Sequence, residues 1–63
     1  MDQKPKCRLV GTDGNAFAVI GNVSRALKAA GQPEKAREWQ QKAMSCGSYD
    51  ELLALVYTYV EPY

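Results

Sequence analysis

The fold of this chain depends on the stretch LVGTDGNAFAVIGNV, residues 9–23, which can be read in two ways. Asp13-Gly14 between two apolar runs is a strong signal for a β-hairpin. The following residues instead predict a helix, because apolar side chains recur at helical spacing. These side chains are Ala16, Ile20, Val23, Leu27 and Ala30. A return strand would leave a helix of only about nine residues, which is short for an independent element. We therefore predict the helix and keep the hairpin as the alternative.

The start of this helix carries candidate caps and a candidate anion site. Thr12, Asp13 or Asn15 could cap it, because each has a side-chain oxygen that accepts a backbone N–H of the first turn. Such N–H groups can also hold an anion. The candidate site for an anion or nucleotide comprises Asp13, Gly14, Asn15 and Ala16, with Arg25 and Lys28 further along. Capping is the simpler use of the same donors.

The residues before this stretch predict one short strand. Side chains alternate along KPKCRL, residues 4–9, so that its cations share one face. These cations are Lys4, Lys6 and Arg8. They could contact the phosphates of a nucleic acid, but the net charge is only +1 and no stacking aromatic lies nearby. Nucleic-acid binding is therefore a second alternative. We expect residues 1–5 to be flexible.

A second helix is predicted from Pro33 to about Ser45. Gly31 suits the left-handed end of the first helix, and proline is favoured at the first position of the next one. Gly21 lies in the middle of the first helix, where glycine costs about 1 kcal/mol relative to alanine. We expect another backbone to come close to Gly21, either within the chain or in a second copy.

A third helix is predicted from Tyr49 to about Val60. Ser48 and Glu51 have the spacing of a capping box in front of an apolar run. The alternative is a C-terminal strand in LVYTYVEPY, residues 55–63, paired with the N-terminal strand.

The third helix carries apolar or aromatic side chains over more than half of its circumference, a wider face than a surface helix usually shows. A chain of 63 residues has few elements to surround it. We therefore expect aromatic and apolar residues of the second and third helices to contact a partner, first of all a second copy. The expected interface residues are Trp39, Leu52, Val56, Tyr57, Tyr59 and Tyr63.

Few side chains in this sequence support catalysis. There is no histidine, which excludes every triad built on imidazole, and the two cysteines lack zinc-site spacing. We read Cys7 and Cys46 as free thiols that pack as small apolar residues. We expect no catalytic residue, metal or cofactor. No apolar run is long enough to span a bilayer and MDQKPKCRLVG has no export signal, so we expect a cytoplasmic protein that does not contact membranes.

A sequence pattern covers most of the chain. It comprises LVG at 9–11, DGNAF at 13–17, Gly21, AL at 26–27, AG at 30–31 and YD at 49–50. In this pattern the chain resembles a group of short uncharacterised proteins of bacteria, their phages and mobile elements. The resemblance implies a stand-alone gene product with a helix over residues 15–30. It also suggests a phage-type inhibitor that binds a host defence protein or sequesters a nucleotide signal.

Together these observations predict a single α+β domain over residues 1–63, with one short N-terminal strand followed by three helices. We expect a homodimer formed through the third helix or through strand pairing. The expected function is non-catalytic binding, with a protein partner first, a small anionic ligand second and a nucleic acid third.

Overall fold

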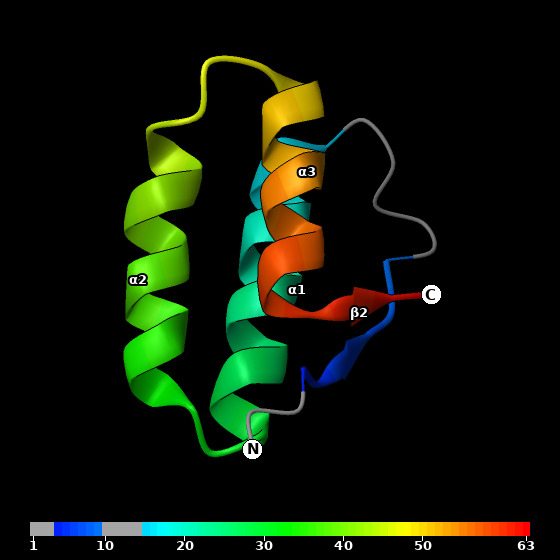
Figure 1. Cartoon of the computed structure of the whole chain (residues 1–63), viewed down its shortest axis with the longest axis vertical. Helices are drawn as coiled ribbons and strands as arrows, with labels where there is room; N and C mark the ends of the chain where they lie inside the picture. The colour runs from blue at the N-terminus through cyan, green and yellow to red at the C-terminus, as the bar shows by residue number, and fades with distance from the viewer. Residues whose placement is uncertain (1–3, 10–14) are drawn as a thin grey trace.

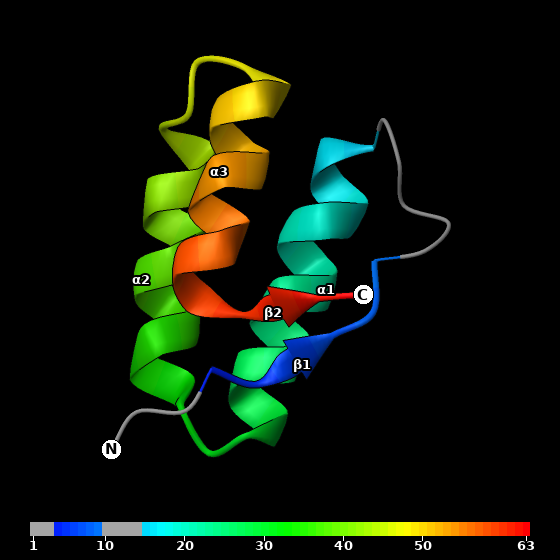
Figure 2. The same ribbon diagram turned by 45° about the vertical axis from the view of Figure 1, so that its right-hand side comes forward.

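The computed structural model describes residues 4–9 and 15–63 and has an α+β fold. Three helices pack together (Figure 1), and two short strands lie side by side in front of α1 in the view of Figure 2. In chain order the elements are β1 (Lys6–Cys7), α1 (Ala16–Ala29), α2 (Pro33–Met44), α3 (Tyr49–Tyr59) and β2 (Glu61–Pro62). The predicted N-terminal strand and three helices are confirmed.

Helix α1 settles the reading of the stretch that decides the fold. It begins at Ala16, so the return strand of a hairpin is wrong for the residues that follow. Asn15 caps the helix, because its Oδ1 accepts the backbone N–H of Ala18 at 3.1 Å. The other candidate caps, Thr12 and Asp13, lie outside the described residues.

The boundaries of α2 and α3 follow the predicted signals. Gly31 has a φ of 77°, the left-handed conformation expected after α1. Pro33 is the first residue of α2. Ser48 Oγ accepts the N–H of Glu51 at 3.2 Å, and Glu51 Oε2 accepts the N–H of Gly47 at 2.7 Å. The predicted pair therefore forms as in a capping box, except that Glu51 accepts from the N–H of Gly47 rather than from that of the cap residue Ser48.

The two strands pair in parallel, with Lys6 opposite Glu61 and Cys7 opposite Pro62. The pairing predicted as an alternative therefore forms, but the C-terminal strand is confined to Glu61–Pro62 because α3 extends to Tyr59. Residues 1–3, the first part of the expected flexible segment, lie outside the described residues.

The hydrogen bonds of this pairing use alternate residues of the N-terminal segment. Pro5 C=O accepts from Glu61 N–H at 2.9 Å, and Cys7 C=O accepts from Tyr63 N–H at 3.0 Å. Leu9 N–H donates to Tyr63 C=O at 3.0 Å. Successive peptide groups of an extended chain point in opposite directions. The N–H and C=O groups of the intervening residues, Lys6 and Arg8, therefore point away from β2.

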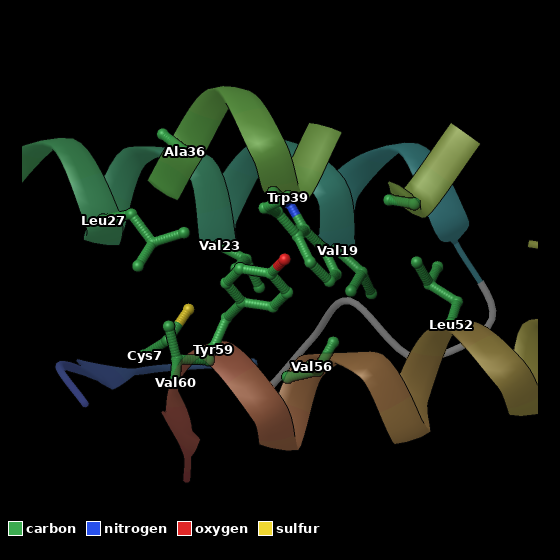
Figure 3. Close-up of a cluster of buried hydrophobic side chains, with 11 residues drawn as sticks. Cys7, Val19, Val23, Leu27, Ala36, Trp39, Leu52, Val56, Tyr59 and Val60 are labelled. Atoms are coloured by element: carbon green, nitrogen blue, oxygen red, sulfur yellow. The ribbon is translucent and has the colours of Figure 1, made fainter. Parts of the chain in front are cut away.

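The core lies between the three helices and the start of the sheet (Figure 3). Trp39 of α2 is completely buried, and its Nε1–H donates to Ile20 C=O of α1 at 3.0 Å. Its ring meets that of Tyr59 edge to face, with centroids 5.7 Å apart. The core comprises Cys7, Val19, Val23, Leu27, Ala36, Trp39, Ala43, Leu52, Val56, Tyr59 and Val60.

Four of the six residues expected at an interface are in this core. Trp39, Leu52, Val56 and Tyr59 are buried within the single chain, so the prediction that they face a partner is wrong. The helical stripe of α1, the narrow apolar stripe of α2 and Cys7 of β1 are together enough to cover this face of α3.

Gly21 also differs from expectation. It is exposed on α1, and a Cβ built there would meet no atom within 4 Å. Within residues 4–9 and 15–63, no other segment therefore comes close to Gly21, and the expected packing against it is wrong for this part of the chain.

Candidate functional site

A groove lies between β1 and the C-terminal half of α1. It encloses about 290 Å³ and is called the basic groove below. Its lining residues are Lys6, Cys7, Arg8, Asn22, Arg25, Ala26 and Ala29. Among the described residues β2 contributes none of this lining, so the groove borders β1 on the side away from β2. In Figure 2, β1 lies between β2 and the C-terminal end of α1.

Periodicity in both elements explains why these residues meet. On β1, Cys7 faces the core with only 3% of its surface exposed, so its neighbours Lys6 and Arg8 face outward. On α1, Asn22 is followed at spacings of four and seven by Ala26 and Ala29, which places all three on one face. The small side chains of Ala26 and Ala29 leave open space beside β1.

Among the described residues that line the basic groove, every charged side chain is positive. These side chains are Lys6, Arg8 and Arg25. None of the three cations makes an ion pair within residues 4–9 and 15–63. The nearest acid in the sheet register is Glu61, which stands opposite Lys6 but on β2. Clustered like charges along a groove raise the local concentration of negatively charged ligands.

The groove also borders an open strand edge. The N–H and C=O groups of Lys6 and Arg8 point away from β2 and have no hydrogen-bond partner in the described part of the chain. The edge of β2 that faces away from β1 offers fewer hydrogen-bonding groups, because Pro62 has no N–H. The open edge of this small sheet is therefore the one on β1.

Of the anion site predicted at the start of α1, the structure describes Asn15, Ala16, Arg25 and Lys28. Asn15 uses its side chain to cap the helix at Ala18 N–H, and Asp13 and Gly14 lie outside the described residues. At 1.5 Å per residue, Arg25 lies about 14 Å and Lys28 about 18 Å along the axis from Ala16. Arg25 and Lys28 therefore lie far along α1 from its first residue, and Arg25 lines the groove beside β1.

Two of the predicted interface residues remain available to a partner. Tyr57 is 64% exposed on α3 and Tyr63 is 65% exposed directly after β2. The structure adds Phe17 and Met44, which are also largely exposed and which the sequence pattern did not indicate. Tyr63 is hydrogen bonded to both Cys7 and Leu9, so it extends the sheet next to β1.

A second groove lies between α2 and α3 and has a different character. It encloses about 470 Å³. It is lined by Lys42, Ser45, Cys46, Glu51, Ala54, Leu55 and Thr58. Its charges are mixed, and the Cys46 thiol donates to Lys42 C=O at 3.5 Å. This groove therefore offers little electrostatic preference for any one ligand.

Cys7, Tyr59 and Glu38 have shifted pKa values, and burial or a hydrogen bond within the fold explains each shift. Burial raises the pKa of the Cys7 thiol, which makes its thiolate scarce. Burial, and then a hydrogen bond to Glu38, raise the pKa of Tyr59 to about 12. That same hydrogen bond lowers the pKa of the Glu38 carboxyl, with a smaller contribution from Lys42. None of these groups creates a reactive centre in the basic groove.

Within the described residues, no three His, Cys, Asp or Glu side chains gather as a metal site would require. None of the helices described has the length and apolar character that crossing a bilayer demands. Comparison with protein-family models, with curated proteins and with solved structures found no match to this chain. Function is therefore inferred from the geometry of the basic groove and its surroundings.

Proposed function

We propose that this chain is a non-catalytic binding protein whose partner is another protein. The observation that carries the proposal is the basic groove, where three cations that make no ion pair with the described residues border an open strand edge. A strand edge presents donors and acceptors in alternation, which matches another polypeptide backbone. A phage-type inhibitor acting on a host protein would be one such binding protein.

The chemistry of the groove favours binding over catalysis. Its thiol, Cys7, is buried and has a raised pKa. Arginine and lysine remain as the polar groups that face outward, together with the Asn22 amide. These groups attract and orient acidic ligands, but a general base near neutral pH is missing from this set.

A capture experiment with matched variants tests the proposal. The tagged chain is used to capture proteins from cells that naturally express it, alongside Arg8→Glu/Arg25→Glu and the control Arg37→Glu/Lys42→Glu. The control makes the same change of charge on α2, which does not contact β1. We expect at least one protein to be retained by the wild type and the control and lost with the groove variant. That protein must then bind the purified chain.

The result that would contradict the proposal is equally specific. If no protein is recovered with the wild type in excess of the groove variant, the basic groove is not a protein-binding site.

The cations of the groove also support a second candidate, binding of a small anion or nucleotide. This site differs from the one predicted at the start of α1, because it unites Arg25 with Lys6 and Arg8. Thermal unfolding with a panel of nucleotides at millimolar concentration tests it, since a ligand that binds the folded state raises its stability by mass action. An unchanged unfolding temperature for every nucleotide would exclude this candidate.

A further inference from the structure

We infer that the basic groove receives an extended acidic segment of the partner, which adds to the free edge of β1 as a third strand. This inference rests on the proposed function and states how the partner is held. The occupant is defined by its chemistry, namely a polypeptide segment with acidic side chains at alternate positions.

The backbone of β1 supplies the first part of the recognition. Lys6 and Arg8 each lie between residues that are bonded to Tyr63 or Glu61, so the segment is already held extended. Their own N–H and C=O groups point to the open side and are unpaired in the described chain. An incoming strand would satisfy these groups without a rearrangement of β1, as in known cases of strand addition.

Charge supplies the second part. Lys6 and Arg8 are two residues apart, so their side chains lie on the same face of β1. Side chains directly opposite one another on neighbouring strands interact favourably when their charges differ. Glutamate or aspartate at positions i and i+2 of the added strand would face these two cations, with Arg25 on the opposite wall.

The floor of the groove supplies the third part. The residue between the two acidic positions would point inward, toward the face of α1 that carries Asn22, Ala26 and Ala29. Alanine side chains leave room there for an apolar side chain of moderate size. The preferred segment therefore alternates acidic and apolar residues.

A second copy of the chain fits the groove poorly. Pairing of two β1 edges would place Lys6 and Arg8 of one copy against the same cations of the other, and like charges directly opposite are destabilising. A nucleic acid also fits less well. Backbone phosphates accept hydrogen bonds but donate none, so they would leave the edge carbonyls unpaired. The described residues that line the groove include no aromatic side chain for base stacking.

The direct test uses a fluorescent peptide of about eight residues in which glutamate alternates with valine, the length of a typical short strand. We expect saturable binding that weakens as salt is raised, because exposed charges are screened. A peptide with lysine in place of glutamate should not bind. No binding of the glutamate peptide to the wild-type chain would overturn the inference.

Variants locate the site. Arg8→Glu/Arg25→Glu should weaken binding of the glutamate peptide by about tenfold or more, as the loss of two favourable charge contacts implies. The control Arg37→Glu/Lys42→Glu should bind within about twofold of the wild type, because its charges lie on α2. Equal losses in both variants would mean general charge attraction and would overturn the inference.

N-methylation of the peptide separates strand addition from charge attraction. In a strand, the N–H groups of alternate residues face the same neighbour. One peptide is methylated on every glutamate nitrogen and the other on every valine nitrogen. If the peptide adds as a strand, methylation at one of these two sets of positions abolishes binding and methylation at the other leaves binding largely intact. Loss with the glutamate set indicates antiparallel addition, and loss with the valine set indicates parallel addition. Equal effects of the two sets would overturn strand addition.

Two further measurements address the other occupants. If single-stranded DNA binds the groove more tightly than the glutamate peptide, a nucleic acid is the occupant and the inference is overturned. If the chain dimerises and Arg8→Glu/Arg25→Glu prevents the dimer, a second copy is the occupant and the inference is likewise overturned. The proposed function has its own test. If a protein is captured through the groove while the peptides do not bind, the function stands and the mode of binding is wrong. If neither occurs, both are wrong.

Discussion

At the scale of single residues, Tyr59 shows how this small core keeps polar atoms satisfied. Its ring is buried against Trp39, while its hydroxyl donates to the exposed carboxylate of Glu38. Trp39 in turn donates to Ile20 C=O. Each large aromatic therefore contributes apolar area to the core and has a partner for its polar group, as buried aromatics require.

Tyr59→Phe should lower the free energy of unfolding by about 1 kcal/mol, because the lost hydrogen bond ends on a group that water can also solvate. In a chain of this size the melting temperature should fall by about 4–8 °C. Tyr57→Phe is the matched control, since Tyr57 is exposed, and it should melt as the wild type does. Thermal unfolding followed by circular dichroism at neutral pH measures both.

The same hydroxyl predicts an alkaline transition. The pKa of Tyr59 is raised from 10.0 to about 12 in the folded chain, so the unfolded chain loses this proton first as pH rises. The contribution to stability is complete below pH 10 and is lost as pH approaches 12. Between pH 10 and pH 12, the free energy of unfolding measured in urea should fall more steeply with pH for the wild type than for Tyr59→Phe. If the free energy of unfolding fell equally with pH in both proteins, the raised pKa of Tyr59 would be contradicted.

Two glycines should respond in opposite directions to the same substitution. Gly21→Ala should stabilise the chain by about 1 kcal/mol, because Gly21 is helical and has open space around it. Gly31→Ala should destabilise it by a similar amount of about 1–2 kcal/mol, because φ is 77° there. Melting temperatures measure both. A destabilised Gly21→Ala would show that this face of α1 is not open.

At the scale of elements, local signals decide where the helices begin and end. Each cap is a contact between residues close in sequence, such as Asn15 with Ala18 or Ser48 with Glu51. This is why the three helices could be predicted to within one residue of most of their ends. The strands were harder to place, because β1 and β2 have two residues each and exist through their mutual pairing.

Ser48→Ala should cost about 1 kcal/mol, since it removes the side-chain acceptor at the start of α3. Ser45→Ala is the control, because the Ser45 hydroxyl bonds to Gln41 C=O on the exposed end of α2 and makes no cap of α3. We expect chemical denaturation to separate the two variants. Equal stability of the two would contradict the role of Ser48.

At the scale of the whole molecule, the fold closes by joining the N-terminal segment to the residues after α3. Pairing of β1 with β2 places Cys7 against Val60 and the helices (Figure 3). A chain of 63 residues has little stability to spare. This one closure between distant parts of the chain therefore matters to the entire core.

The reactivity of Cys7 should report on this closure. In Cys46→Ser, the remaining thiol is buried and has a raised pKa, so a colourless disulfide reagent should modify it slowly and at the rate of opening or unfolding. Removing residues 61–63 deletes β2 and should make Cys7 react far faster. The reverse variant, Cys7→Ser, should react rapidly at the half-buried Cys46. Equal rates before and after truncation would show that β2 does not protect Cys7.

The amino-acid sequence by itself indicated the three helices, the cap of α3 and the alternation of β1, because each depends on residues close to one another in the chain. It left three candidate caps for α1 and a strand alternative at each end of the chain. The tertiary structure decided which face of α3 is inside, where Trp39 packs, and that Arg25 joins Lys6 and Arg8 rather than the start of α1. These outcomes depend on contacts between segments far apart in the chain. Spacing along one element cannot specify them, because it does not state which other element will cover a given face.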